Sequence, residues 1–444
     1  MIRRLHYTPW IIGCTTLLWS PCSARADLFE YLKKPDDSFA WKLIKKTDVG
    51  ECTVYDIKLT SQTWQNIKWE HDLQVFLPKG VKPGGKMLLW NQGGKSSAGS
   101  ALLGTQLAQK IQAPVALLFG IPNQPLFGDD NKKGLVEDAL IAETFIRYLD
   151  TKDSSWPLLF PMVKSLVKAM DALQEFAQKE WGVRLEGFIV TGGSKRGWTT
   201  WLTAASDARV IAIAPLVIDT LNMPEQLKLQ LRSYGKYSEQ IKDYTARGLA
   251  PPPDTPDARR LWGWVDPWNY RDRIKAPTMI INGANDPYWT VDSLNLYWDD
   301  LKQDKWVLYV PNAGHNLKQK QANGKEDNDR AINALCAFAR HVISENPMPK
   351  VQWKHDDADG QARLTVMADG GATAARLWVA QAPTRDFRKA IWKEQMLEFK
   401  EGRAVGVVPA SAEGYTAFFG ELDFATGAIR HHLSTQVRVL EAKR

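Results

Sequence analysis

Cysteine is rare in this chain, with 4 among 444 residues, and the motifs that hold nucleotides or zinc are missing. The sequence contains no Walker loop, no dinucleotide-binding fingerprint and no H-E-x-x-H pair, so we expect no metal and no organic cofactor. The formal charge of +7 is small for this length and is not gathered in a run, which argues against a nucleic-acid partner. Tryptophan, by contrast, is frequent at 19 residues and indicates an aromatic core or binding surface.

The first 26 residues have the pattern of a signal peptide, with Arg3 and Arg4, a short apolar stretch at 10–19 and a small-residue cleavage motif at Ala24-Arg25-Ala26. The apolar stretch is too short for a membrane-spanning helix. We therefore expect an exported protein, periplasmic or secreted, with no membrane span once the signal is removed. Only Cys52 and Cys336 would remain, enough for one disulfide or none.

The strongest motif is a glycine-rich turn between a predicted strand and a predicted helix. The apolar run 188–191 ends in Gly192-Gly193-Ser194, and helical spacing of apolar residues begins at Trp198. Strand, sharp turn, serine and helix form the layout of a nucleophile elbow. The usual G-x-S-x-G form has glycine two positions after the serine, whereas Arg196 stands there and Gly197 comes one later. The sequence thus predicts a variant elbow with Ser194 as nucleophile.

Strand-like and helix-like segments alternate on both sides of this motif. The predicted strands are 52–60, 68–77, 87–90, 114–119, 188–191, 210–218, 277–281 and 306–310, and the predicted helices are 27–45, 135–149, 161–180 and 328–343. This alternation indicates an α/β fold with a mostly parallel sheet and helices on both faces. Together with the elbow it predicts the α/β-hydrolase fold for residues 27–345.

Asp286 and His315 each come directly after one of the last two predicted strands. Loops at the carboxyl ends of parallel strands converge, so we expect both side chains near Ser194. A serine nucleophile needs a histidine to take its proton and a carboxylate to orient the imidazole. The order Ser194, Asp286, His315 is that of α/β-hydrolases, and the sequence predicts this catalytic triad. Asp219, which also ends a predicted strand, is the rival carboxylate.

The stretch Asn91-Gln92-Gly93-Gly94 ends the predicted strand 87–90. In α/β-hydrolases the loop after the third strand supplies one N–H of the oxyanion hole, and glycine lets the backbone approach a ligand closely. We assign the oxyanion hole to the N–H of Lys195 and one near Gly93 or Gly94. The side chains of Lys195 and Arg196 could favour an acidic substrate, but structural or solvated roles are favoured.

Residues 222–265 are polar, helix-prone and too long for a simple connection between sheet elements. The segment leaves the sheet at the edge that carries the triad, so we predict a lid over Ser194. We expect Tyr234, Trp262 and Trp289, the last just after Asp286, to bind substrate. The alternative is a helical layer packed away from the site.

A linker is predicted at Asn346-Pro347-Met348-Pro349. Beyond it, residues 350–444 consist of short β-type segments with glycine and aspartate turns and no helical pattern. This pattern predicts a small β-sandwich-like C-terminal domain. It could bind a surface, cover the active site or add stability.

Several segments resemble the PhoPQ-activated pathogenicity-related protein family. They are residues 192–198, 161–165, 282–286 and, near the end of the chain, 375–380. The resemblance extends over almost all of the chain after the signal. It implies an exported bacterial protein of α/β-hydrolase type, associated by name with the PhoP/PhoQ virulence regulon.

These observations predict an exported serine hydrolase that cleaves an ester or amide bond of a small molecule without a cofactor. One alternative is a peptidase that acts on short peptides. The other is a non-catalytic secreted binding protein that keeps the hydrolase fold.

Overall fold

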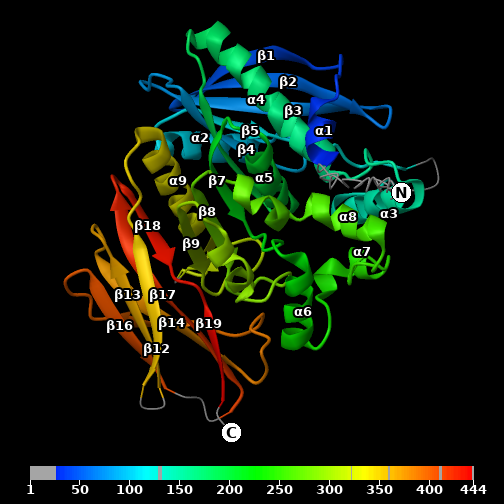
Figure 1. The fold of residues 1–444 in the computed structure, drawn as a ribbon. Coiled ribbons are helices and arrows are strands. Elements are labelled where there is room, and N and C mark those ends of the chain that lie inside the picture. Colours follow the sequence, from blue (N-terminus) through cyan, green and yellow to red (C-terminus); the bar gives the residue numbers. More distant parts are fainter. Residues whose placement is uncertain (1–26, 129–132, 322, 359–360, 410–412, 443–444) are drawn as a thin grey trace, which may run out of the picture.

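The computed structural model describes residues 27–128, 133–321, 323–358, 361–409 and 413–442 (Figure 1). The candidate signal peptide lies outside these ranges. Within them, no helix combines the length and apolar character that crossing a bilayer requires.

The sheet that carries the site is built from nine strands in the first three quarters of the chain. They are β1 (Ala40–Val49), β2 (Cys52–Trp64), β3 (Ile67–Pro78), β4 (Lys86–Asn91), β5 (Val115–Leu118), β6 (Gly187–Gly193), β7 (Val210–Leu216), β8 (Thr278–Gly283) and β9 (Lys305–Val310). Their spatial order is β1-β2-β3-β5-β4-β6-β7-β8-β9. The first three pair antiparallel, and the strands from β5 to β9 run parallel.

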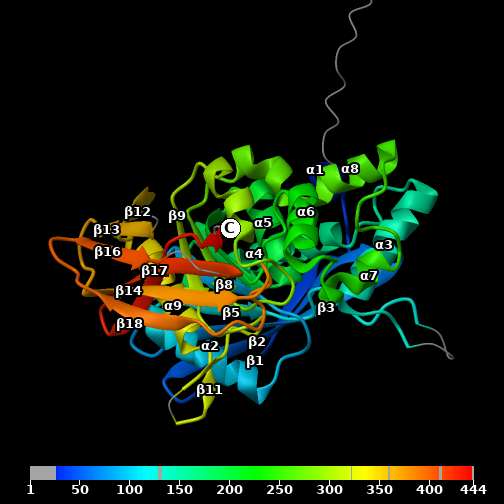
Figure 2. The ribbon, with the colours of Figure 1, turned by 90° about the horizontal axis from the view of Figure 1, so that it is seen from below.

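Helices cover both faces of this sheet (Figures 1 and 2). On one face lie α1 (Asp27–Lys33), α4 (Leu159–Trp181) and α5 (Lys195–Ser206), and on the other lie α2 (Ala98–Ile111) and α9 (Asp329–Ser344). Each face buries its own apolar cluster. Parallel strands buried on both faces read as continuous apolar runs, which is why these segments were recognisable. The predicted α/β-hydrolase fold is confirmed.

The predicted helix at 27–45 is wrong beyond residue 33. Residues 40–49 form β1, which pairs along β2 from Ala40 to Val49. Trp41 and Leu43 pack on the core, whereas their neighbours Ala40, Lys42 and Ile44 are exposed, a period of two that suits an edge strand.

The predicted insertion contains α6 (Met223–Tyr234), the 3₁₀ turn η1 (Glu239–Ile241), α7 (Lys242–Thr245) and α8 (Pro256–Val265). Helices α7 and α8 pack against α3 (Glu137–Thr151), which precedes α4. After the insertion come η2 (Pro267–Arg273), η3 (Ser293–Leu296), η4 (Trp298–Asp300) and a short hairpin of β10 (Gln319–Lys320) and β11 (Glu326–Asp327).

The C-terminal part consists of antiparallel strands in two sheets. One contains β12 (Val351–Ala358), β13 (Gln361–Ala368) and β16 (Arg403–Val408), and the other contains β14 (Ala374–Ala382), β15 (Lys393–Leu397), β17 (Tyr415–Thr426), β18 (Ile429–Ser434) and β19 (Arg438–Glu441). β18 pairs with β9 at Ser434 and Val307, so the second sheet continues the central one. Among the described residues this gives a single 14-stranded sheet. Cys52 and Cys336, the two cysteines in the described part of the chain, are buried and free and form no disulfide with each other.

Candidate active site

Ser194 stands at the junction of β6 and α5 with φ 58° and ψ −128°, a conformation that is costly for a residue with a side chain. Two glycines make this turn possible. A Cβ on Gly192 would lie 2.5 Å from Asn91 Nδ2, and one on Gly197 would lie 2.5 Å from Ile218 Cγ2. The backbone N–H of Ser194 donates to Leu216 O of β7 at 2.9 Å. The strained serine is therefore held by tight packing on both sides.

His315 and Asp286 are joined by a hydrogen bond of 2.8 Å between Nδ1 and Oδ2. A carboxylate only accepts, so His315 carries its proton on Nδ1 and leaves Nε2 free to take another. Nε2 is buried and has no hydrogen-bond partner among the described residues. The second oxygen of Asp286 accepts the backbone N–H of Tyr288 at 2.8 Å, which fixes the carboxylate.

Asp219, the rival carboxylate, has other partners. Tyr297 donates its hydroxyl to one oxygen, and Asn282 Nδ2 donates to the other at 2.9 Å. Burial raises the pKa of Asp219 to about 7, against the effect of these two hydrogen bonds. The histidine is therefore bound to Asp286, and Asp219 belongs to a separate buried network.

Lys195 and Arg196 face inward and are neutralised by two acidic residues of α3. Arg196 forms a two-pronged pair with Glu137 at 2.6 Å, and Lys195 Nζ lies 2.9 Å from Glu137 and 3.1 Å from Asp138. Burial would raise the pKa of Glu137, but the hydrogen bonds from Arg196 and the charges of both cations lower it to about 2. The four charges cancel, so this corner of the site carries no net charge.

The N–H of Lys195 is at the first turn of α5, where backbone donors lack intrahelical acceptors and the helix dipole favours negative charge. Gly93 lies against the guanidinium of Arg196. A Cβ at position 93 would be only 2.1 Å from Arg196 Nη2. Gly94 has φ +66°, which suits glycine. Neither Gly93 nor Gly94 is among the residues that line the cavity described next.

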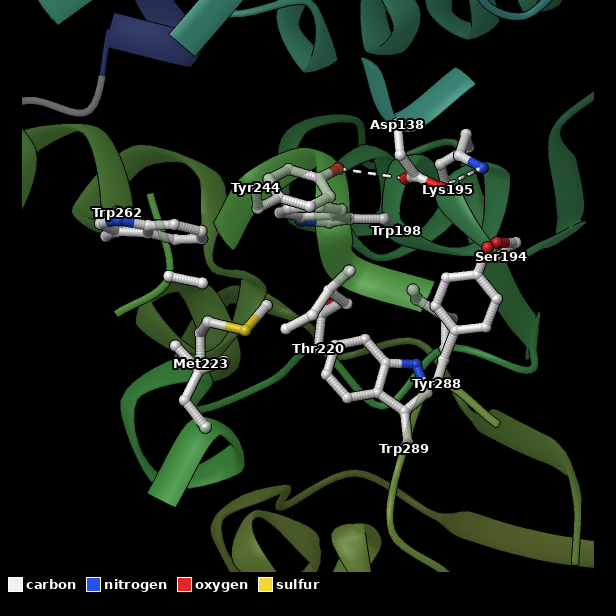
Figure 3. A pocket seen from close by; sticks show the side chains of 14 residues that line it. Asp138, Ser194, Lys195, Trp198, Thr220, Met223, Tyr244, Trp262, Tyr288 and Trp289 are labelled. Carbon is white, nitrogen blue, oxygen red and sulfur yellow. Dashed lines mark hydrogen bonds and ion pairs between the residues drawn. The ribbon is translucent and has the colours of Figure 1, made fainter. Parts of the chain in front are cut away.

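Ser194 lines a cavity of about 50 Å³ whose wall is mainly apolar (Figure 3). The other lining residues are Asp138, Lys195, Trp198, Ile218, Thr220, Met223, Leu227, Ile241, Tyr244, Ala250, Trp262, Tyr288 and Trp289. Six of these, Met223, Leu227, Ile241, Tyr244, Ala250 and Trp262, come from the insertion. In Figure 3, Ser194 and Tyr288 lie at one end and Trp262 lies at the other. The insertion thus forms one wall of the cavity beside Ser194.

Two of the three predicted substrate-binding residues, Trp262 and Trp289, line this cavity. Tyr234 is not among the residues that line this cavity. The guanidinium of Arg388 lies 3.9 Å from the centre of its ring and covers it. Tyr234 therefore joins the insertion to the C-terminal part of the chain.

Sequence reasoning missed Tyr288. Its ring lies 4.3 Å from the ring of His315, at an angle of 31°, and it also lines the cavity. Burial and the charge of Asp138 raise its pKa to about 12, so it remains a neutral phenol. Its place two positions after Asp286 was visible, but no local pattern marks a tyrosine that will stack on a histidine.

Glu421, Asp423 and His432 form a second cluster of ligand-type side chains, on β17 and β18. Arg330 of α9 donates to both oxygens of Glu421 at 2.7 Å, and Arg376 pairs with Asp423. Since two guanidinium groups already neutralise these carboxylates, the cluster links α9 to the C-terminal strands and is unsuited to a cation.

Comparisons with known proteins find a curated relative and several solved structures that are similar to this chain. The chain is 32% identical over 381 residues to autocrine proliferation repressor protein A of Dictyostelium discoideum, covering 81% of this chain and 76% of that protein. Solved structures with a similar fold include acetyl xylan esterase 1 from Thermoanaerobacterium sp. JW/SL YS485 (16% identity, 71% of this chain and 93% of that one, TM-score 0.46). Another is an S-formylglutathione hydrolase from Agrobacterium tumefaciens (12% identity, 69% and 98%, TM-score 0.42).

A family model described as PhoPQ-activated pathogenicity-related protein matches residues 28–388, which include the elbow, the His315–Asp286 pair and the insertion. With a match of this extent, the chain belongs to the PhoPQ-activated pathogenicity-related protein family.

Proposed function

We propose that this protein is an exported serine hydrolase that cleaves esters of short, neutral acyl groups. Ser194 attacks the carbonyl, His315 takes the serine proton on Nε2 and later gives it to the leaving group, and Asp286 holds the imidazole. The N–H of Lys195 stabilises the oxyanion, with a second donor from the Gly93-Gly94 loop. One such donor is typically worth about 3 kcal/mol in the transition state. The observation that carries the proposal is the 2.8 Å His315–Asp286 hydrogen bond at the sheet edge that also bears the strained Ser194.

The size and charge of the cavity support the acyl specificity. A volume of about 50 Å³ is well below the roughly 150 Å³ of a cavity that holds benzene. The charges of Lys195 and Asp138 in its wall pair with each other, so the site offers no unpaired charge to an acidic or basic group. Export is proposed from the signal-like residues 1–26 alone.

The test uses the full chain after residue 26 with a fluorophosphonate probe and a panel of p-nitrophenyl esters and peptide p-nitroanilides. We expect labelling of the native protein, faster turnover of the acetyl than the octanoyl ester, and loss of both activities in Ser194→Ala. Ser206→Ala, at the other end of α5, is the matched control and should retain both. Preference for peptide amides would favour the peptidase, and absence of labelling would favour a non-catalytic binding protein.

A further inference from the structure

The segment between β14 and β15, residues 383–392, contacts both loops that carry the His–Asp pair. Asn285, directly before Asp286, donates its side-chain amide to Phe387 O at 3.0 Å and to Ala390 O at 2.8 Å. Asn312, three positions before His315, donates to Trp392 O at 2.9 Å and accepts the N–H of Trp392 at 2.8 Å. Four hydrogen bonds therefore join these loops to the connection between β14 and β15.

The segment 383–392 is itself well anchored. Phe387 and Trp392 are each 2% exposed, and the Trp392 ring lies 5.1 Å from the ring of Phe419 on β17. Arg385 pairs with the buried Asp292 after β8. The packed rings and the ion pair keep this segment in place. They thereby fix the carbonyl groups to which Asn285 and Asn312 donate.

The two loops are also joined to each other. The backbone N–H of Asn285 donates to Ala313 O at 3.0 Å. Gly283 faces Gly314 so closely that a Cβ would lie 2.4 Å from its carbonyl oxygen. The two loops are therefore in direct backbone contact, and this contact helps to set the distance between Asp286 and His315.

We propose that Asn285 and Asn312 are positioning residues through which the C-terminal strands hold the His315–Asp286 pair in its working geometry. The inference rests on the proposed function for its effect on rate. Neither asparagine lines the cavity, and nor does any residue of 383–392, so their contribution falls on the chemical step and not on substrate binding. The C-terminal part of the chain thereby belongs to the catalytic apparatus.

The test compares Asn285→Ala and Asn312→Ala with Asn295→Ala in the full chain. Asn295 is the matched control, because its amide also bridges to the C-terminal part, donating to Val437 O at 2.9 Å and accepting from Gln436 at 2.8 Å, away from both loops. Readouts are kcat and KM for p-nitrophenyl acetate, the rate of fluorophosphonate labelling, the melting temperature, and hydrogen–deuterium exchange of residues 283–288 and 311–317.

We expect the two loop variants to lose at least tenfold in kcat and labelling rate, with KM within about twofold. Exchange should rise in both loops, while Asn295→Ala changes neither kcat nor that exchange. If the alanine variants do not fold, Asn285→Asp and Asn312→Asp keep the side-chain shape but remove the amide donors, and the same results are expected.

Losses no larger than those of Asn295→Ala, or a change confined to KM, would overturn the inference. If the native protein neither labels nor turns over, the proposed function fails instead. Loop exchange then decides the positioning role independently: faster exchange in the loop variants alone supports it, and unchanged exchange rejects it.

Discussion

The guanidinium of Arg196 occupies the space that a side chain at Gly93 would need, with Nη2 only 2.1 Å from the position of a Cβ. Arg196 stands where the usual elbow has glycine. Its Nε donates to Ile121 O at 2.5 Å, and its other nitrogens bind Glu137. The absence of a side chain at position 93 therefore leaves room for the large side chain at position 196, where the common elbow has glycine.

Gly93→Ala should displace this guanidinium from its partners. We expect a loss of about 1–3 kcal/mol in the free energy of unfolding, as for other overpacked sites. Urea unfolding measures it, with Gly99→Ala as the control, because the nearest atom to a Cβ there is 3.7 Å away. Equal stability of the two variants would show that Arg196 has room to move.

Asp286→Asn should lower kcat far more than Asp219→Asn does. The first change removes the acceptor that fixes the His315 tautomer, and such a change costs about 10⁴ in kcat in a serine protease. The second alters a carboxyl that binds Tyr297 and Asn282. Steady-state kinetics on p-nitrophenyl acetate compares the two variants. A larger loss of kcat in Asp219→Asn would show that Asp219, and not Asp286, is the triad acid.

Trp262→Ala should shift substrate preference towards longer acyl chains, because the indole closes the end of the cavity away from Ser194. Tyr234→Ala should leave the ranking of acetyl, butyryl and octanoyl esters unchanged and lower the melting temperature, since its ring packs under Arg388. If Tyr234→Ala reorders the esters and Trp262→Ala does not, substrate lies elsewhere in the site.

The raised pKa of Asp219 should make the free energy of unfolding fall as the pH rises. Burial raises its pKa to about 7 in the folded protein, while the unfolded value is about 3.9. Between these values the unfolded chain releases the proton and the folded chain keeps it, so the contribution is complete below about pH 4 and is lost as the pH rises through 7. Urea unfolding at pH 5 and at pH 8 measures this change. Between these two pH values the free energy of unfolding of Asp219→Asn should fall less than that of the native protein, by on the order of 2 kcal/mol. Parallel pH profiles for both proteins would exclude this role.

The strands, the elbow and two of the candidate site residues could be predicted, because each depends on a local pattern in the sequence. Apolar runs located the buried parallel strands, and the glycines around Ser194 located the elbow. Asp286 and His315 could be assigned because each directly follows such a run. Their hydrogen bond agrees with that assignment.

Features set by distant contacts could not be predicted. Tyr234 is aromatic and lies in the insertion, yet a residue more than a hundred positions later, Arg388, determines its surroundings. The central sheet continues into the C-terminal strands because β18 pairs with β9 at Ser434 and Val307. Nothing in the local sequence of either strand marks the other as its partner. Long-range pairings of this kind become visible only when the whole chain is folded.

The position of residues 383–392 late in the chain has a consequence for the order of synthesis. Ser194, Asp286 and His315 all leave the ribosome before the carbonyl groups that Asn285 and Asn312 bind. A nascent chain that stops short of this segment lacks the carbonyl groups to which Asn285 and Asn312 donate. Because Trp392 itself packs on Phe419, this attachment can be completed only after β17 has been synthesised as well.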